Sequence, residues 1–355
     1  MRVVVAMSGG VDSSVAAALL VEAGHDVVGL SMQLYDQREG RESFGSCCSL
    51  DDLYDARRVA TSLGIPHYIV NFEEQFQATV VRNFVDEYAA GRTPIPCVHC
   101  NADLKFAHLM DRAVGFDAGA VATGHYARVV FDEDTRRYQL LRSADADKDQ
   151  SYFLFSLTQD QLARAMFPVG ALTKPEVRHH ARRLGLLVAD KPDSHEICFI
   201  PDGATADFVT RHLPDAADDG EIIDSSGAVI GRHRGVHRYT IGQRKGLGVS
   251  GKAPLYVLRL EPADQRVVVG PREELGRADF RAKDVNWIAG TPPSGPARLT
   301  ARIRHRHTDA PATVTPEGDG FASVLFDEPQ LAVTPGQAAV FYDGQIVAGG
   351  GWIAE

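Results

Sequence analysis

The stretch Ser8-Gly9-Gly10-Val11-Asp12-Ser13-Ser14 follows directly on the apolar run Val3-Val4-Val5-Ala6. The β-branched run predicts a buried strand, and Ser13 to Ala23 predicts a helix that ends at Gly24. Glycine lets the backbone approach a ligand closely, and a helix start offers N–H groups and a positive dipole end. The serine hydroxyls add donors. The segment therefore predicts an anion-binding turn between a strand and a helix.

The turn lacks the Gly-Lys-Ser/Thr ending of a Walker loop, so no lysine of the motif itself is placed to follow a γ-phosphate. We interpret it as a turn that grips pyrophosphate and leaves the α-phosphate of ATP open to attack. Asp12 then acts through a bound Mg²⁺ or fixes the turn as an acceptor. The alternative is a plain strand-to-helix turn with a serine N-cap. The motif resembles the PP-loop of the ATP pyrophosphatases, which implies an enzyme that splits ATP to AMP, and we call Ser8–Ser14 the PP-loop.

Composition bounds the class of protein. The chain has 355 residues, 44% hydrophobic and 24% charged, which is ordinary for a globular protein of two or three domains. Its net charge of −10 argues against a generally basic surface that coats nucleic acid, but not against a local patch. No apolar stretch is long enough to span a bilayer, and the first strand begins at Arg2. We therefore expect no leader peptide, no membrane partner and a cytoplasmic location.

Strands and helices alternate through the first 125 residues. The expected strands are Arg2–Ala6, Val27–Met32, His67–Asn71 and Ala120–Thr123. A helix at Asp51–Leu63 opens at a capping box, Ser49-x-x-Asp52. This alternation predicts an α/β fold with a parallel sheet covered by helices on both faces. Because ligands gather at the carboxyl ends of parallel strands, the loops after Ala6, Met32 and Thr123 are expected to form one site.

The rest of the chain predicts a hairpin, two helices and a β-rich half. The hairpin pairs Ala127–Phe131 with Arg137–Arg142, and the helices are Gln159–Met166 and Lys174–Leu184. Residues after Pro201 predict a small, β-rich central domain. Short alternating strands then predict an antiparallel barrel: Tyr256–Leu260, Arg266–Val269, Arg298–Arg304, Ala322–Phe326, Ala338–Tyr342 and Ile346–Trp352, with a hairpin turn at Asp343-Gly344. We expect domains at residues 1–202, 203–275 and 276–355.

Five cysteines suggest catalytic or metal-binding thiols, because a reducing cytosol disfavours a disulfide framework. In Pro94-Ile95-Pro96-Cys97-Val98-His99-Cys100-Asn101, Cys100 falls near the start of a helix-like run through Lys105 to Ala113, which favours its thiolate. Cys198 lies in Asp193-Ser194-His195-Glu196-Ile197-Cys198-Phe199-Ile200-Pro201. Three alternatives stay open: a zinc site completed by His99 or His195, an iron–sulfur cluster on Cys97, Cys100 and Cys198, and buried inert thiols. No role is assigned to Cys47-Cys48.

Six motifs carry a closer resemblance, to the bacterial tRNA-specific 2-thiouridylase (MnmA) family. They occur here in the family's order: Ser-Gly-Gly-Val-Asp-Ser, Pro-Cys-x-x-Cys-Asn, Thr123–Ala127, Lys148–Leu154, Glu196–Pro201 and Thr240–Gly246. With Pro335-Gly336-Gln337 in the tail, the resemblance covers nearly the whole chain. It implies a catalytic PP-loop domain, a central tRNA-binding domain and a C-terminal β-barrel.

The resemblance implies that ATP drives replacement of the 2-oxygen of the wobble uridine by sulfur in tRNAs for Lys, Glu and Gln. The uracil oxygen attacks the α-phosphorus and releases pyrophosphate, after which sulfur attacks C2 and AMP departs. Cys198 matches the family's persulfide-bearing cysteine, loaded by a cysteine desulfurase or a sulfur-relay protein. Cys100 matches the nucleophile, whose attack leaves a Cys100–Cys198 disulfide that cytosolic reductants reset.

The resemblance also implies binding residues. ATP is expected to bind together with Mg²⁺, and Asp12 is also expected to be catalytic. The expected ATP contacts are Ala6, Met7, Ser8, Gly9, Gly10, Val11, Asp12, Ser13, Met32 and Gly124. The expected tRNA contacts are Ile95, Pro96, Cys97, His125, Lys148, Asp149, Gln150, Arg304, His305, Arg306 and Gln337. From the residues alone, Lys148–Gln150 is an ordinary solvated charge run, whereas Arg302–His307 places alternate cations on one face of a strand as phosphate contacts require. An exposed strand face is the alternative for the second segment.

The chain departs from the family pattern at Ile95, where the family carries Asn, so any base contact there uses backbone groups. Position 97 is Asp in some members, so Cys97 is not the expected nucleophile, but it keeps an iron–sulfur-dependent tRNA thiolase open. Two other functions remain as alternatives. One is a PP-loop ligase that amidates a small carboxylate and releases pyrophosphate without tRNA. The other is a non-catalytic tRNA-binding protein that has kept the fold.

Overall fold

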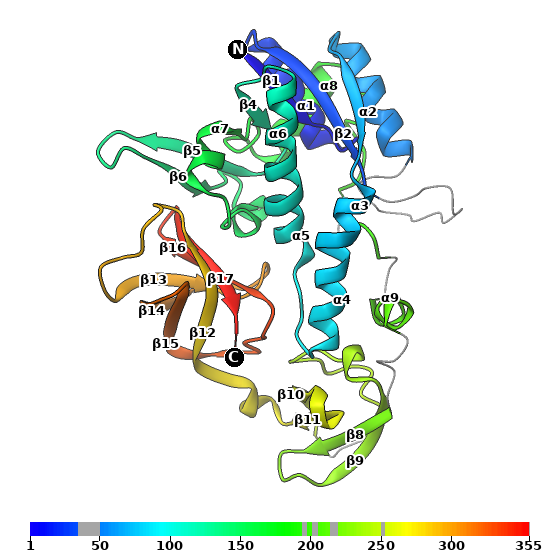
Figure 1. The fold of residues 1–355 in the computed structure, drawn as a ribbon, viewed down its shortest axis with the longest axis vertical. Coiled ribbons are helices and arrows are strands. Elements are labelled where there is room, and N and C mark those ends of the chain that lie inside the picture. Colours follow the sequence, from blue (N-terminus) through cyan, green and yellow to red (C-terminus); the bar gives the residue numbers. More distant parts are fainter. Residues whose placement is uncertain (35–49, 194–196, 201–204, 214–218, 250–252, 355) are drawn as a thin grey trace.

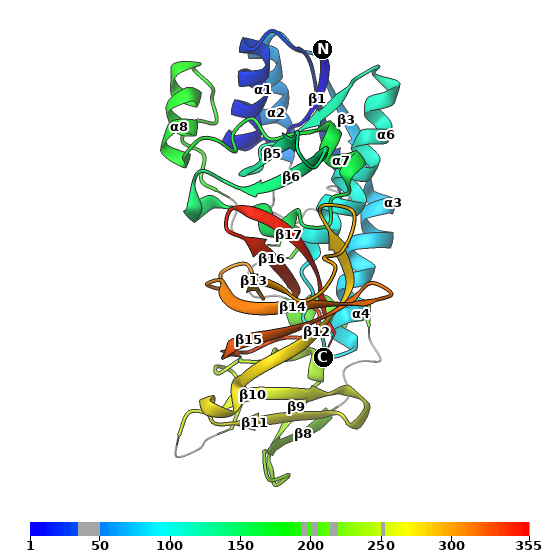
Figure 2. The same cartoon turned by 90° about the vertical axis from the view of Figure 1, so that its left-hand side faces the viewer.

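The computed structural model describes residues 1–34, 50–193, 197–200, 205–213, 219–249 and 253–354. Three features of the sequence analysis lie outside these residues: the capping residue Ser49, the pair Cys47-Cys48 and the candidate zinc ligand His195. The molecule is elongated: a parallel sheet with helices lies at one end of its long axis, a small β-sheet at the other end, and a β-barrel between them (Figures 1 and 2).

The N-terminal sheet has the expected parallel strands. Its strands run in the order β3-β2-β1-β4-β7, and every pair is parallel: β1 (Arg2–Ala6), β2 (Asp26–Gln33), β3 (His67–Asn71), β4 (Ala120–Ala122) and β7 (Ala165–Met166). Val3 and Val5 of β1 pack in one core cluster and Val4 in another. This alternation buries both faces of the strand, as a parallel sheet between helices requires.

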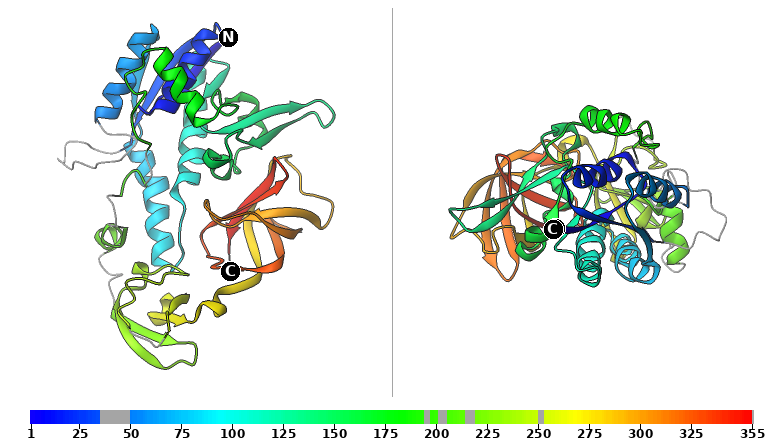
Figure 3. Two further views of the ribbon diagram at one scale, coloured as in Figure 1. Left: turned by 180° about the vertical axis from the view of Figure 1, so that it is seen from behind. Right: turned by 90° about the horizontal axis from the view of Figure 1, so that it is seen from above.

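Helices cover both faces of this sheet. The face from which the side chains of Val3 and Val5 project packs against α1 (Val11–Glu22), α2 (Leu50–Leu63) and α8 (Lys174–Arg183). The other face packs against two longer helical runs. The first joins α3 (Glu73–Phe76), the π-helix η2 (Gln77–Val81) and α4 (Arg82–Ala89); the second joins α5 (Pro96–His99), the π-helix η3 (Cys100–Phe106) and α6 (Ala107–Gly115). From behind, α4 runs from the parallel sheet toward the small β-sheet (Figure 3).

Two helix predictions need correction. The second run starts at Pro96 and not near Cys100 as expected, because proline fits the first helical position, where no N–H is needed. Cys100 therefore lies one turn inside the helix. The helix expected at Gln159–Met166 is α7 (Gln159–Arg164), and its last two residues pair with β4 as strand β7. A tertiary strand partner overrides the local helical pattern there.

Six antiparallel strands close the C-terminal barrel. They run in the order β12-β15-β14-β13-β16-β17, and β17 pairs back to β12: β12 (Gly276–Trp287), β13 (Ala297–Arg302), β14 (Ala310–Gly318), β15 (Phe321–Leu331), β16 (Ala338–Asp343) and β17 (Ile346–Ile353). The turn at Gly344 (φ 56°) confirms the expected hairpin. The expected hairpin β5 (Ala127–Asp132) and β6 (Arg137–Arg142) is also present, and β6 extends the barrel sheet through Leu141 and Ile346.

The central domain is a separate small sheet with its own core. Its strands run in the order β10-β11-β8-β9: β8 (Asp219–Asp224), β9 (Val229–Arg234), β10 (Tyr256–Glu261) and β11 (Arg266–Gly270). Ile222, Val257 and Val267 are fully buried in it. Helix α9 (Thr205–His212) precedes the sheet and contacts α4. The fold class expected from the sequence is therefore confirmed, with one correction: the strands expected at Tyr256–Leu260 and Arg266–Val269 belong to this central sheet, as β10 and β11, and not to the barrel.

Candidate active site

The PP-loop adopts a backbone conformation that only glycine fits. Gly9 has φ +73°, and a Cβ there would stand 2.2 Å from the backbone oxygen of Asp52 in α2. Gly10 then caps α1, whose first N–H groups lack acceptors within the helix. The turn and the helix start therefore present backbone donors at the carboxyl end of β1, as the sequence predicts.

The serines of the PP-loop divide into two kinds. Ser13 and Ser14 are buried, and both hydroxyls donate to the carbonyl of Gly10, at 3.2 and 2.8 Å. The N–H of Ser8 donates to Ser13 Oγ at 3.2 Å. These bonds fix the turn. Ser8 is exposed, so its hydroxyl is the one that can reach a ligand most easily.

The loop after β4 lies against the PP-loop. A Cβ on Gly124 would stand 2.5 Å from the backbone nitrogen of Ser13 and 2.7 Å from the carbonyl carbon of Asp12. On the other side, Met7 N–H donates to Leu30 of β2, the strand that carries Met32. The carboxyl ends of β1, β2 and β4 therefore meet at one edge of the sheet, where the expected ATP contacts lie.

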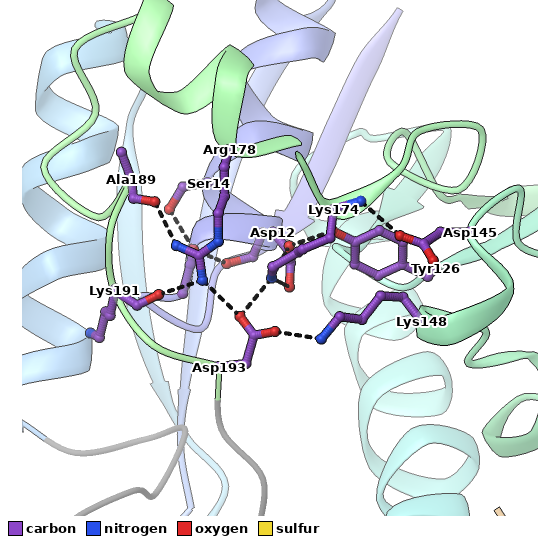
Figure 4. Close-up of polar contacts among 12 residues, drawn as sticks. Asp12, Ser14, Tyr126, Asp145, Lys148, Lys174, Arg178, Ala189, Lys191 and Asp193 are labelled. Carbon is purple, nitrogen blue, oxygen red and sulfur yellow. Dashed lines mark hydrogen bonds and ion pairs between the residues drawn. The ribbon is translucent and has the colours of Figure 1, made fainter. Parts of the chain in front are cut away.

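Asp12 has partners that the sequence did not reveal. Lys174 Nζ donates to both of its carboxylate oxygens, at 2.8 and 2.9 Å, and the Tyr126 hydroxyl donates at 2.8 Å (Figure 4). Burial and the nearby Asp12 carboxylate raise the pKa of Tyr126, so it stays a donor. An ammonium bound to both oxygens of Asp12 does not fit direct Mg²⁺ coordination by this carboxylate. The acceptor role weighed for Asp12 is the one this geometry supports.

A second carboxylate beside Asp12 gathers three cations. Asp193 lies 2.7 Å from Lys148 Nζ, 2.7 Å from Lys174 Nζ and 3.2 Å from Arg178 Nη2. We call these four side chains the Asp193 cluster. Burial acts to raise the pKa of Asp193, but hydrogen bonds from Lys148 and Lys174 outweigh it and lower the pKa to about 2. The Asp193 carboxylate is therefore ionised at neutral pH.

The chain before Asp193 is fastened to the PP-loop. Lys191 Nζ donates to the Gly9 carbonyl at 3.1 Å and to Asp52 and Asp55 of α2 at 2.7 and 2.6 Å. Arg178 donates to the carbonyls of Ala189 and Lys191. Sequence reasoning missed Lys174, Arg178, Lys191 and Asp193. The sequence held one sign of a role for two of them, since Lys191 and Asp193 lie shortly before Cys198.

The expected catalytic cysteines contact one hydrophobic cluster. Cys100 is buried within it, and the half-buried Cys198 packs against it beside Phe199. The Phe199 ring lies 5.4 Å from that of Phe76 and 5.3 Å from that of Phe84, which holds the Cys198 segment beside the helices. Cys97 is exposed in the first turn of α5. The dipole argument made for Cys100 therefore applies more directly to Cys97.

The metal alternatives find little support in this arrangement. Within the described residues, no group of three or more His, Cys, Asp or Glu side chains is arranged to hold a metal ion. Cys97, Cys100 and Cys198 thus do not form a three-thiolate site, and His99 stacks on Trp352 with ring centroids 4.6 Å apart. Among the described side chains, neither the iron–sulfur site nor a zinc site completed by His99 fits, and the zinc site completed by His195 lies outside the described residues.

His125 joins the PP-loop edge to the cysteine helix. Thr123 Oγ1 and His125 Nδ1 are 2.6 Å apart, and the His125 ring lies 6.4 Å from Phe106 of η3. Burial, with the nearby Lys105 ammonium, holds the pKa of His125 well below its usual range. Its ring is therefore neutral at pH 7 and can meet tRNA by stacking or hydrogen bonding but not as a cation.

The segment Lys148–Gln150 is not a solvated charge run. Asp149 is buried, and its carboxylate accepts from the N–H groups of Ser143 and Ser151. Gln150 Oε1 accepts from the N–H of Tyr126 at 2.9 Å. Lys148, one-third exposed, is the member of this segment best placed to reach a ligand.

The strand expected to carry alternate cations ends early. β13 stops at Arg302, and residues 303–306 form bends and a turn. Arg302 turns inward because it pairs with Asp309 at 2.6 Å, whereas Arg304, His305 and Arg306 are exposed. The His305 ring lies 4.6 Å from that of Phe153, and partial desolvation there, together with the nearby Arg302, lowers the pKa of His305 although the residue as a whole is exposed. The prediction of one cationic strand face is wrong, but two arginines of the turn stay accessible.

The barrel holds the loop that precedes Cys97. Gln337 Nε2 donates to the carbonyl of Thr93 at 2.9 Å, and Thr93 N–H donates to Pro335. Ile95 is the half-buried N-cap of α5, and Pro96 is buried. Gln337 therefore holds this loop in place by a hydrogen bond within the protein. Cys97 is the exposed residue at the end of the loop.

Three family models match consecutive parts of the chain. They are described as a tRNA methyl transferase HUP domain at residues 1–202, a tRNA methyl transferase PRC-barrel domain at 206–271 and an aminomethyltransferase beta-barrel domain at 277–353. No helix among the described residues is both long and apolar enough to cross a membrane.

Two curated relatives match along the whole chain, and both are tRNA-specific 2-thiouridylases MnmA. That of Solibacter usitatus is 56% identical over 99% of this chain and 98% of its own length. That of Acidobacterium capsulatum is 53% identical over 99% and 98%. Among solved structures, a 4-thiouridine synthetase–RNA complex with bound ATP is 17% identical over 60% of this chain and 50% of that chain, with a TM-score of 0.38.

Proposed function

We propose a reaction for this chain, which belongs to the tRNA-specific 2-thiouridylase (MnmA) family: it activates a tRNA uridine with ATP and replaces its 2-oxygen by sulfur. The observation that carries the proposal is the meeting of the PP-loop, the Gly124 loop and the cysteine helix at one edge of the sheet. This arrangement offers an ATP site and a thiol site to the same base.

The PP-loop holds ATP in the first step. Backbone N–H groups of the turn and the start of α1 bind the pyrophosphate oxygens, and Mg²⁺ enters with the nucleotide. Gly124 packs so closely on Ser13 that no side chain fits between the two loops. The proposed contacts remain Ala6 to Ser13, Met32 and Gly124. The wobble uridine oxygen attacks the α-phosphorus and pyrophosphate leaves.

The cysteines supply sulfur in the second step. Cys198 carries a persulfide received from a cysteine desulfurase or a relay protein. Its outer sulfur attacks C2 of the adenylated uridine and AMP leaves. The Cys100 thiolate then attacks the Cys198 sulfur, which frees the 2-thiouridine and leaves a Cys100–Cys198 disulfide for a cellular dithiol to reduce. Both side chains contact the same hydrophobic cluster, which supports this pairing.

The tRNA is bound along the face that joins the three parts. The proposed side-chain contacts are those expected residues that are at least partly exposed and do not hold a loop from within: Cys97, His125, Lys148, Gln150, Arg304, His305 and Arg306. Ile95, Pro96, Asp149 and Gln337 act by shaping the loops that contact the RNA. The proposed domain borders stay at 202/203 and 275/276, with tRNAs for Lys, Glu and Gln as substrates and the cytoplasm as the site of action.

The test is a complete reaction with matched cysteine variants. Purified protein is mixed with ATP, Mg²⁺, cysteine desulfurase, cysteine and unmodified tRNA for Glu, and 2-thiouridine and AMP are measured by mass spectrometry. We expect both products in equal amounts, and none of the 2-thiouridine with Cys100→Ser or Cys198→Ser. Cys48→Ser, at a cysteine to which no role is assigned, is the control and should keep most activity. Full activity in both of the first two variants, or AMP formation without tRNA, contradicts the proposal.

A further inference from the structure

Three cations from separate segments converge on the single carboxylate of Asp193. Lys148 follows the β5–β6 hairpin, Lys174 is the first residue of α8, and Arg178 lies one turn later in α8. Each places a nitrogen within 3.2 Å of Asp193 (Figure 4). An ion pair needs one cation. Three around one carboxylate make a site suited to a larger anion.

The cluster lies directly beside the PP-loop. Lys174, whose side chain is only 10% exposed, bridges Asp193 and Asp12 with its ammonium group. The start of α8 thus meets the start of α1, so two positive helix ends point to one region. Three cations face two carboxylates there. If Asp193 moved away, Lys148 and Arg178 would lose their shared carboxylate, whereas Lys174 would keep Asp12 and lie beside Asp145, which accepts from its backbone N–H at 2.8 Å. The two released cations would suit a polyanion.

Carboxylate and phosphate oxygens accept from lysine and arginine in the same way, so one can replace the other at such a site. We propose that, before tRNA binds and takes Lys148 as a contact, Lys148, Lys174 and Arg178 bind the β- and γ-phosphates of ATP, and that the Asp193 carboxylate competes with these phosphates for the three cations. The inference rests on the proposed ATP-binding function of the PP-loop. It adds the side-chain cations that the PP-loop motif itself lacks.

Removal of the competing carboxylate provides the first test. Asp193→Asn keeps the size of the side chain and removes its charge, so inorganic pyrophosphate should bind about tenfold more tightly, by titration calorimetry without tRNA. The affinity for AMP, which lacks the β- and γ-phosphates, should change by less than about twofold in the same variant. Asp190→Asn is the matched control, because Asp190 is three residues away and pairs with the exposed Arg182. An unchanged pyrophosphate affinity, or equal gains for AMP and pyrophosphate, overturns the proposal.

Removal of one cation provides the second test. Lys148→Gln should weaken pyrophosphate binding by about tenfold, whereas Lys245→Gln, an exposed lysine of the central domain, should leave it unchanged. In the Asp193→Asn background the Lys148→Gln loss should be larger, because that lysine is no longer shared with a carboxylate. A thermal melt of each variant confirms that it is folded. Equal losses in both backgrounds contradict competition.

Parallel measurement of 2-thiouridine separates this inference from the proposed function. If the wild-type protein thiolates tRNA while Asp193→Asn leaves pyrophosphate affinity unchanged, the phosphate subsite is wrong and the function stands. If the wild-type protein makes no 2-thiouridine, the function fails whatever the binding data show.

Discussion

The molecule contains two clusters of ion pairs with similar side chains but different roles. One is the Asp193 cluster, and the other lies at the junction with the barrel. In the second, Arg142 and Arg302 pair with Asp149 and Asp309, and we call these four residues the barrel cluster. The Asp149 side chain is 3% exposed, and Arg142 also lies over the Tyr342 ring at 3.4 Å. The Asp193 cluster is more exposed and contains two lysines.

The difference lies in charge balance and in geometry. Two planar guanidinium groups face two carboxylates in the barrel cluster, so the charges are matched and the hydrogen bonds are directional. Lysines are point charges on flexible stems, and three cations share two carboxylates beside the PP-loop. Matched and buried ion pairs fix a domain junction, whereas unmatched charge beside backbone donors prepares a ligand site.

The largest expected effect follows from breaking the barrel cluster. Asp149→Ala leaves two buried arginines short of one partner, so the free energy of unfolding in urea should fall by about 3–5 kcal/mol. Pyrophosphate affinity of the folded protein should stay within about twofold. Asp327→Ala, which breaks the exposed pair with Arg298, is the control and should hardly change stability. If Asp149→Ala weakened pyrophosphate binding strongly, the two clusters would not be separate in function.

The PP-loop backbone should respond almost as strongly. Gly9→Ala places a methyl group on the Asp52 carbonyl, so the loop must shift and ATP use should fall about 100-fold. Gly24→Ala is the matched control, since Gly24 ends the same helix with φ +78° and open space around it. AMP formation with tRNA present measures both. Equal losses in the two variants would mean that backbone strain, and not the contact with Asp52, decides the effect.

A pH series tests the charge of the Asp193 cluster. The lowered pKa of Asp193 adds stability that is present above its ordinary pKa and is lost as pH falls toward about 2. The difference in unfolding free energy between wild type and Asp193→Asn should therefore be constant from pH 7 to 5. Below pH 5 it should shrink by roughly 2 kcal/mol. A difference that grows on acidification would contradict the charged cluster.

The smallest effect concerns the stack between the cysteine helix and the barrel. His99→Gln removes the nearly parallel contact with Trp352, for an expected loss of about 1 kcal/mol in urea unfolding. It also removes the ion pair with Asp103, so Asp103→Asn measures that part alone. If both variants lose the same stability, the stack adds nothing to the junction.

The sequence was sufficient for the elements built from local patterns. The strand, the Gly-rich turn and the helix of the PP-loop are contiguous, and the order of apolar runs predicts the parallel sheet. The same holds for the Asp343-Gly344 hairpin, where two residues determine the turn. Each depends on neighbours along the chain.

What escaped prediction depends on distant partners. Lys174 and Asp12 are 162 positions apart, so no spacing announces their contact. The cationic strand predicted at Arg302–His307 failed because Arg302 turns inward to Asp309, which ends the pairing of β13. From the sequence, Asp149 is likewise a solvated charge, but in the structure it is buried and pairs with Arg302 of the barrel. Lone charged residues are the ones whose roles only tertiary structure assigns.

The pairing of β6 with β17 has a consequence for protein engineering. Leu141 of the catalytic domain and Ile346 of the barrel are hydrogen-bonded neighbours in one continuous sheet. A chimera that exchanged residues 276–355 for the tail of a relative would therefore cut through a shared ladder and expose an unmatched edge. A graft that carries the 127–142 hairpin together with the barrel keeps this ladder, but it must also keep an aspartate at position 149, which pairs with Arg142 and Arg302 across the junction.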